Sequence, residues 1–200
     1  MKISQLAQRL EYHFETLTGE PVTDPEQVRR LRAAEITAIT NDSRKITDGC
    51  LFFCIVGARS DGHDYALQAL RSGARALVVQ KSLDLSAYQV PEGAEEPVIL
   101  KVHDSRYAIA FLSAAYYGNP AEEMKIIGVT GTKGKTTTTY MVKKMLENAG
   151  FRVGLIGTIE AVYGDVHIPA STTTPESMRL QEIFREMADA GVEVVVMEVS

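Results

Sequence analysis

Tryptophan is absent from the 200 residues, and cysteine occurs only twice, as Cys50 and Cys54. Two cysteines are too few for the disulfide framework of a small secreted scaffold. The usual zinc spacings are excluded as well, because no C-x-x-C motif and no pair of histidines lies nearby. Their spacing places both thiols on one face of a strand. We therefore expect two buried, free thiols in a reducing compartment.

Long apolar runs and an excess of positive charge are also missing. No apolar stretch approaches the ~20 residues of a membrane span, and the N-terminus lacks the apolar core of a signal peptide. The formal net charge is -5, whereas sequence-independent nucleic-acid binding needs a basic face. The densest basic cluster, Arg29, Arg30 and Arg32, is explained by a solvated helix face. These absences predict a cytoplasmic protein with no nucleic-acid partner and no membrane partner.

What is present suits a folded α/β protein. Hydrophobic residues make up 45% and charged residues 24% of the chain, close to globular averages, so the chain can bury a core. The length suits one large domain or two small ones. Gly118-Asn119-Pro120 is the strongest break in the pattern. We place a boundary there, which predicts domains at 1–120 and 121–200.

Before the break, short apolar strands alternate with helices. Helical spacing runs from Ile3 to Tyr12, and a second helix at 65–72 ends at Gly73. Asp104 is a suitable N-cap for a third helix that reaches Tyr117. Strands are expected at 36–40, 51–56, 76–80 and 98–102. This half is therefore predicted to be a small α/β domain.

After the break, regular alternation predicts a parallel sheet with crossover helices. We expect strands at 125–129, 152–156 and 192–199, and helices at 135–149 and 176–190. The last strand is apolar throughout, as in a sheet covered on both faces. Because the sequence stops at the end of that strand, after only three strands in this half, we expect a fragment of a longer protein.

The segment I-I-G-V-T-G-T-K-G-K-T-T-T-T, 126–139, joins an apolar strand to an amphipathic helix. Its glycines let the backbone turn tightly and approach phosphate oxygens. N–H groups at a helix N-terminus bind anions. Lys135 would then reach the β- and γ-phosphates, and Thr136 would offer a hydroxyl to Mg²⁺. The segment is typical of a phosphate loop.

The match to the strict pattern G-x-x-x-x-G-K-[ST] is not complete. Counting back from Gly134, the first glycine should stand where Val129 is found, and Gly128 lies one residue early. A glycine-rich turn that binds nothing is disfavoured, because Gly-Lys-Thr lies between a strand and a helix. The predicted ATP site comprises Gly131, Thr132, Lys133, Gly134, Lys135, Thr136 and Thr137, with Lys135 as the catalytic residue.

Four other polar segments allow two explanations each. Glu198 ends the last strand, where it could hold Mg²⁺ or face solvent, and position alone does not decide. The run 171–175, S-T-T-T-P, could grip a phosphate, a sugar or a carboxylate, but pattern alone favours a capping run. The polar segments 41–44 and 61–64 are better explained as turns.

Four motifs in this order resemble those of the Mur ligase family. They are D-S-R with the following D-G-C-L-F-F-C-I-V-G, then D-G-H, then G-V-T-G-T-K-G-K-T-T-T, then T-T-T-P-E-S followed by V-M-E-V-S. The likeness spans about Asn41 to Ser200. The phosphate loop alone marks the wider family, which includes folylpolyglutamate synthases. D-S-R and D-G-H are similar to the members that add a diamino acid to UDP-N-acetylmuramoyl-L-alanyl-D-glutamate.

The resemblance implies an α/β fold of three domains. This chain would hold the small N-terminal UDP-substrate-binding domain and the first part of a P-loop parallel-sheet ATP-binding domain, truncated at Ser200. The implied partners are ATP, Mg²⁺, the UDP-N-acetylmuramoyl-dipeptide and the diamino acid, bound by a monomer. The implied reaction forms an amide bond. The D-glutamyl carboxylate attacks the γ-phosphate of ATP, an acyl phosphate results, and the amine of diaminopimelate or lysine displaces phosphate.

The resemblance also implies roles for single residues. Ser43 matches a serine that contacts the UDP-sugar substrate, and Ala58, Arg59 and Ser60 occupy a loop that lies against the same nucleotide. Lys133 stands where the family usually has asparagine, which adds a cation near the phosphates.

In the second half, the resemblance assigns substrate contacts and a metal ligand. Thr173 and Thr174 match a threonine pair that holds the muramoyl-peptide. Ser200 matches the first serine of E-V-S-S-H, which touches the same substrate, and Glu198 matches the Mg²⁺-binding glutamate. Thr172 stands where asparagine is frequent.

Two other functions are open at this stage. A small-molecule kinase would also use a phosphate loop, but no arginine-rich lid is found in the sequence. A nucleotide-sugar-binding module without catalysis would bind the UDP-linked substrate but not ATP. For a ligase, we expect the 200 residues alone to be inactive, because the amino-acid-binding domain and the family's carbamylated lysine are missing. The choice of amino acid would belong to that domain.

Overall fold

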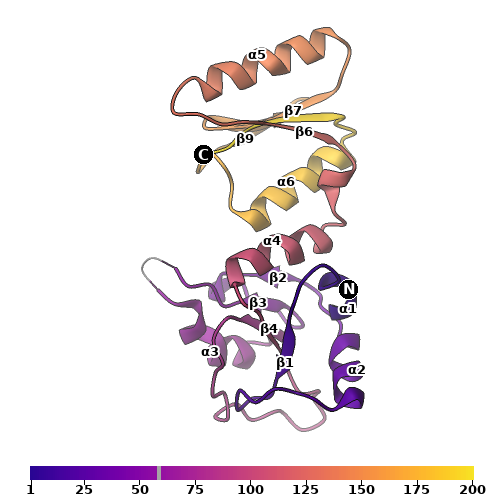
Figure 1. The fold of residues 1–200 in the computed structure, drawn as a ribbon, viewed down its shortest axis with the longest axis vertical. Coiled ribbons are helices and arrows are strands. Elements are labelled where there is room, and N and C mark those ends of the chain that lie inside the picture. The colour runs from indigo at the N-terminus through magenta and orange to yellow at the C-terminus, as the bar shows by residue number, and fades with distance from the viewer. Residues whose placement is uncertain (58–59) are drawn as a thin grey trace. The chain divides into compact units, whose positions relative to one another are not determined.

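The computed structural model describes residues 1–57 and 60–200, which form two compact units, Met1–Tyr116 and Tyr117–Ser200. Each unit has its own five-stranded sheet and its own helices (Figure 1). The sequence change from short, buried strands to a longer strand-helix alternation therefore corresponds to two separate hydrophobic cores. None of the helices in the described ranges combines the length and the apolar character needed to cross a bilayer.

The first unit is a mixed sheet in the order β1-β5-β4-β3-β2. The edge strand β1 (His13–Glu15) is antiparallel to β5, and the other strands are mutually parallel. These are β2 (Ile39–Thr40), β3 (Leu51–Phe53), β4 (Ala76–Val79) and β5 (Val98–Lys101). The helices are α1 (Ile3–Leu6), α2 (Pro25–Ala33), α3 (Ala66–Arg71) and α4 (Ser105–Tyr116), with 3-10 turns η1 (Ser43–Lys45) and η2 (Gly62–Tyr65).

The core of the first unit forms around the central strands. Both β3 and β4 are fully buried, as their apolar runs predict for strands covered on both faces. Cys50 and Cys54 lie in this core as free thiols, which confirms that part of the prediction. Burial raises the pKa of the Cys54 thiol to about 12, as expected for a thiol packed in an apolar core.

The second unit has the strand order β6-β10-β7-β8-β9. The strands β6 (Lys125–Val129), β10 (Val194–Glu198) and β7 (Val153–Ile156) are parallel, and β8 (Glu160–Tyr163) and β9 (Val166–Pro169) complete the sheet as an antiparallel hairpin. The long helices α5 (Lys135–Asn148) and α6 (Ser177–Asp189) cover opposite faces of this sheet (Figure 1). A short 3-10 turn, η3 (Pro120–Glu122), precedes β6.

Two predictions of local structure are wrong. The first helix does not continue to Tyr12 but ends at Leu6, and the chain then turns into the short strand β1. The second unit has five strands and not three, because Gly164 supplies the left-handed backbone (φ 53°) of a tight turn that folds β8 onto β9. An all-parallel sheet is therefore replaced by a parallel sheet that carries an antiparallel hairpin.

Candidate functional site

The phosphate-loop segment lies at the carboxyl end of β6 and leads directly into α5. Gly131 (φ 143°) and Gly134 (φ 80°) adopt backbone conformations that favour glycine, and Gly134 is the N-cap of the helix. The first-turn N–H groups of a helix have no intrahelical partner, and glycine offers no side chain to cap them. The loop residues 130–134 are exposed. This segment therefore presents several backbone donors to an anion outside the protein.

Lys135 begins the helix and folds back over the loop. Its ammonium nitrogen donates a hydrogen bond of 2.8 Å to the carbonyl oxygen of Gly131. The neighbouring Thr136 is half-buried, and its carbonyl accepts a bond of 2.9 Å from the hydroxyl of the fully buried Thr139. The loop thus has a rigid helical anchor on one side and a cation lying across it. This combination suits the charge and size of a polyphosphate.

Glu198 ends β10 and is 1% exposed, so the alternative of a solvent-facing acid is wrong. Its carboxylate accepts a hydrogen bond of 3.0 Å from the backbone N–H of Thr158, and the Thr158 hydroxyl lies 3.1 Å from its second oxygen. β10 pairs in parallel with β6, in a register that sets Glu198 opposite Val129. Because Val129 directly precedes the loop, the buried carboxylate and the phosphate loop both lie at the carboxyl ends of the parallel strands. We call this end of the sheet the shared sheet edge.

The threonine run 172–174 packs against the end of β10. The Thr174 hydroxyl donates to the Glu198 carbonyl (3.0 Å) and accepts from the backbone N–H of Ser200 (3.1 Å). The hydroxyl of Thr173 lies 3.1 Å from that of Thr158. The structure therefore brings three predicted substrate-binding residues together beside the predicted metal ligand. The capping explanation favoured by the pattern is wrong, because the N-cap of α6 is Glu176 and no side chain caps the helix.

A divalent cation at this edge would depend on few protein ligands. Within the described residues, no group of three or more histidine, cysteine, aspartate or glutamate side chains could hold a metal ion. Mg²⁺, however, is commonly held by one or two protein oxygens together with substrate phosphates and water. One buried carboxylate at Glu198 and the hydroxyl of Thr136 near the loop fit that mode of binding. The donor set is therefore compatible with Mg²⁺ bound together with a nucleotide.

In the first unit, the predicted substrate residues also follow parallel strands. Ser43 opens η1, three residues after β2, and its neighbour Asp42 caps this turn by accepting from the backbone N–H of Arg44 (3.0 Å). The guanidinium of Arg44 is the largest influence that lowers the pKa of Asp42, to about 2. Ser60 is exposed and follows β3. The predictions for Ala58 and Arg59 fall outside the described residues.

The D-G-H segment, 61–63, forms a hydrogen-bonded network with the residues after β4, and sequence reasoning missed this network. The Asp61 carboxylate accepts from the backbone N–H of His63 (3.0 Å) and from its ring Nδ1 (2.5 Å), and it pairs with the ammonium group of Lys81. The buried ring of His63 accepts from the backbone N–H of Gln80 through Nε2 (3.0 Å). The bond from Lys81 is the largest influence that lowers the pKa of Asp61.

The same segment closes the loop that follows β3. Val56 and Asp61 form an isolated antiparallel bridge, and Arg106 donates to the Val56 carbonyl (3.0 Å). A turn was the favoured explanation of this segment, and the structure adds that Val56 bonds to α4 and that Asp61 and His63 bond to the residues after β4. An aspartate two residues before a histidine was the available signal in the sequence.

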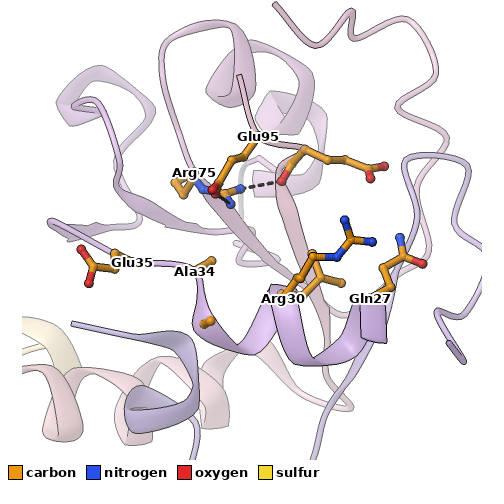
Figure 2. A pocket seen from close by; sticks show the side chains of 9 residues that line it. Gln27, Arg30, Ala34, Glu35, Arg75 and Glu95 are labelled. Carbon is orange, nitrogen blue, oxygen red and sulfur yellow. Dashed lines mark hydrogen bonds and ion pairs between the residues drawn. The ribbon is translucent and has the colours of Figure 1, made fainter. Parts of the chain in front are cut away.

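A cavity of about 640 Å³ in the first unit is lined by other residues, among them Arg30, Arg75 and Glu95 (Figure 2). It is lined by α2 and by the segments that precede β4 and β5, at the opposite edge of the first sheet. Arg75 inside it donates to the Glu96 carbonyl (2.5 Å) and pairs with Glu95, so its charge is already balanced. The cavity contains none of the predicted site residues.

Comparison with known proteins gives matches over most of the chain. Residues 35–117 match the model "Mur ligase family, catalytic domain", and residues 129–200 match "Mur ligase middle domain". The UDP-N-acetylmuramoyl-L-alanyl-D-glutamate–2,6-diaminopimelate ligase of Clostridium botulinum is 50% identical over 167 residues, which are 83% of this chain and 33% of that protein. The chain thus spans about a third of the length of such curated relatives.

Solved structures show the same fold. A UDP-N-acetylmuramoyl-L-alanyl-D-glutamate–2,6-diaminopimelate ligase superposes with a TM-score of 0.65 at 20% identity, over 94% of this chain and 36% of that chain. The MurF ligase of Thermotoga maritima in complex with ADP gives a TM-score of 0.50 at 25% identity, over 80% of this chain and 31% of that chain. The fold, the two matched models and the sequence identity agree, and the chain belongs to the Mur ligase family.

Proposed function

We propose that the chain carries the ATP site and part of the UDP-substrate site of an ATP-dependent amide ligase in peptidoglycan precursor synthesis. The ligase adds a diamino acid to UDP-N-acetylmuramoyl-L-alanyl-D-glutamate. The observation that carries this proposal is the shared sheet edge in the second unit. There, an exposed loop of backbone donors lies beside a buried carboxylate and a cluster of hydroxyls.

The residues of the second unit would act mainly by positioning and charge stabilisation. N–H groups between Gly131 and Thr137 bind the phosphates of ATP, and Lys135 moves from the Gly131 carbonyl to the transferring phosphoryl group. Thr173, Thr174 and Ser200 hold the substrate so that its D-glutamyl carboxylate can attack the γ-phosphate in line, with ADP as the leaving group. The resulting acyl phosphate reacts with the amine of the diamino acid, which forms the amide and releases phosphate.

Mg²⁺ would be held by Glu198 and Thr136 together with phosphate oxygens. When bound, the ion neutralises charge on the transferring phosphoryl group. The relative whose structure contains ADP supports nucleotide binding by this fold.

The first unit would bind the UDP end of the substrate. Ser43 and the loop 58–60 follow neighbouring parallel strands, β2 and β3, and ligands of open α/β sheets gather at that edge. Of the two amino acids considered, 2,6-diaminopimelate is favoured by the names of the relatives. A cytoplasmic location and a monomeric state remain predictions of the same proposal.

The decisive experiment compares Lys135→Ala with Lys144→Ala, an exposed lysine farther along the same helix. Calorimetry in the full-length protein measures the affinity for a non-hydrolysable ATP analogue. Loss of a hydrogen-bonded charge contact should weaken binding by about 10- to 100-fold in Lys135→Ala and leave Lys144→Ala unchanged.

An unchanged nucleotide affinity in Lys135→Ala would contradict the phosphate-loop assignment. Binding of UDP-N-acetylmuramoyl-dipeptide without any binding of ATP would instead indicate a nucleotide-sugar-binding module.

A further inference from the structure

Gly157 and Thr158 follow β7 at the sheet edge that carries the phosphate loop, and neither belongs to a motif that carries the family likeness. We propose that Thr158 is a positioning residue. It orients the Glu198 carboxylate for metal binding and links it by a hydrogen bond to Thr173. This inference rests on the proposed function, which assigns Glu198 to Mg²⁺ and Thr173 to the substrate.

Gly157 makes room for the carboxylate against the backbone. A Cβ atom at this position would lie 2.4 Å from Oε1 of Glu198, closer than any side chain allows. Without that atom, Oε1 approaches the backbone N–H of Thr158 to 3.0 Å. A carboxylate that is 1% exposed requires donors to offset its loss of hydration. Thr158 supplies a donor to each of its two oxygens.

The Thr158 hydroxyl also reaches the predicted substrate residue Thr173. It lies 3.1 Å from Oε2 of Glu198 and 3.1 Å from the hydroxyl oxygen of Thr173, and it is the donor toward both. Because the hydroxyl carries only one proton, the two acceptors share it. Thr158 therefore connects the predicted metal ligand to a predicted substrate residue.

Thr174 holds the main chain of Glu198. Its hydroxyl proton is directed to the Glu198 carbonyl, and its oxygen accepts from the Ser200 N–H. Glu198 is therefore fixed twice: its side chain by Thr158 and its backbone by Thr174. Substrate contacts and the metal ligand are thereby joined in one hydrogen-bonded chain, and Thr158 is the link that touches the carboxylate.

The test compares Thr158→Val, which removes only the hydroxyl, with Thr158→Ser, which retains it. Thr23→Val, on an exposed loop of the first unit, serves as the matched control. Calorimetry in the full-length protein measures the affinity for a non-hydrolysable ATP analogue, once with Mg²⁺ and once with EDTA. Thr158→Val should reduce the Mg²⁺-dependent gain in affinity by about 10- to 100-fold, as for other residues that orient metal ligands. The EDTA affinity should not change, and Thr158→Ser should retain the gain.

The outcomes separate this inference from the proposed function. If the unsubstituted protein binds no nucleotide, or gains nothing from Mg²⁺, the proposed function itself fails. If it gains from Mg²⁺ and Thr158→Val gains equally, Thr158 is not a positioning residue and the ligase proposal stands. Should Thr158→Val not fold, the pair Thr158→Ala and Thr158→Ser decides by the same measurement.

Discussion

Asp61 illustrates how a single side chain of the first unit serves two purposes. Its carboxylate caps η2 at the backbone N–H of His63 and, through the His63 ring and Lys81, holds η2 to the end of β4. The family likeness assigns the residues just before it, 58–60, to the nucleotide of the substrate. Asp61 therefore fixes the point at which the chain leaves that predicted segment.

The depressed pKa of Asp61 predicts how stability depends on pH. A carboxylate whose folded pKa lies below its ordinary value of about 3.9 stabilises the protein fully above that value. The contribution is lost as pH falls below about 4 toward the folded pKa. We expect the free energy of unfolding of the first unit to decrease across that window. Urea unfolding followed by circular dichroism at a series of pH values measures it.

Asp61→Asn provides the comparison. This variant should be less stable at neutral pH and should lose less stability on acidification, whereas Glu92→Gln, on an exposed loop, should behave like the unsubstituted chain. An equally steep loss in Asp61→Asn would show that other acids control the acid transition.

At the scale of elements, the η2 turn depends on close backbone packing. A Cβ atom on Gly62 would lie 2.6 Å from the backbone nitrogen of Ile55 and 2.9 Å from its oxygen. Backbone atoms beside a buried strand cannot shift as a flexible side chain can. Gly62→Ala should therefore destabilise the first unit by about 1–3 kcal/mol, in the range of overpacked cores.

Gly93→Ala is the matched control for this substitution. Gly93 has open space around it, but its left-handed backbone (φ 77°) alone should cost about 1 kcal/mol. Equilibrium unfolding in urea compares the two variants. A smaller loss in Gly62→Ala than in Gly93→Ala would mean that the turn adjusts to the added methyl group.

The elements differ in how well the sequence predicts them. Asp104 accepts from the backbone N–H groups of Arg106 (2.7 Å) and Tyr107 (3.2 Å), so the cap predicted for α4 is confirmed. Strand β6 has the predicted bounds, because glycine-rich punctuation follows it. The β8–β9 hairpin was not predicted, since its outer strand β9 is largely exposed and lacks a continuous apolar run. Apolar runs in a sequence indicate buried strands well, but they indicate exposed edge strands poorly.

The residues of the candidate site also differ in how well the sequence predicts their surroundings. The phosphate loop was predictable because its residue types are demanded by local backbone geometry. The environment of Glu198 was not, because its donors at Thr158 lie 40 residues away in sequence and meet it only through strand pairing. Contacts of this kind follow from the strand order, and the strand order includes the hairpin that the sequence pattern did not reveal.

At the scale of the whole molecule, two separate cores predict two unfolding units. A ligand that binds only one native unit stabilises that unit by mass action, by about 2.7 kcal/mol at a concentration 100 times its dissociation constant. We expect a non-hydrolysable ATP analogue with Mg²⁺ to slow hydrogen exchange in residues 117–200 and to leave 1–116 unchanged. Mass spectrometry of exchanged peptides resolves the two ranges.

Lys135→Ala is the control for this measurement and should abolish the protection. Equal protection of both ranges would contradict the assignment of nucleotide binding to the second unit.

The strand order of the second unit also bears on how the protein is made. Within the described sheet, β6 is an edge strand whose hydrogen-bonded neighbour is β10, the last strand in sequence. During translation, β6 is synthesised first. It remains without its partner β10 until the intervening helices and hairpin have been synthesised. Throughout this interval a nascent chain therefore leaves the backbone N–H and C=O groups of β6 without their partner strand. Translation pauses or chaperone binding within it should influence the yield of native protein more than events during synthesis of the first unit.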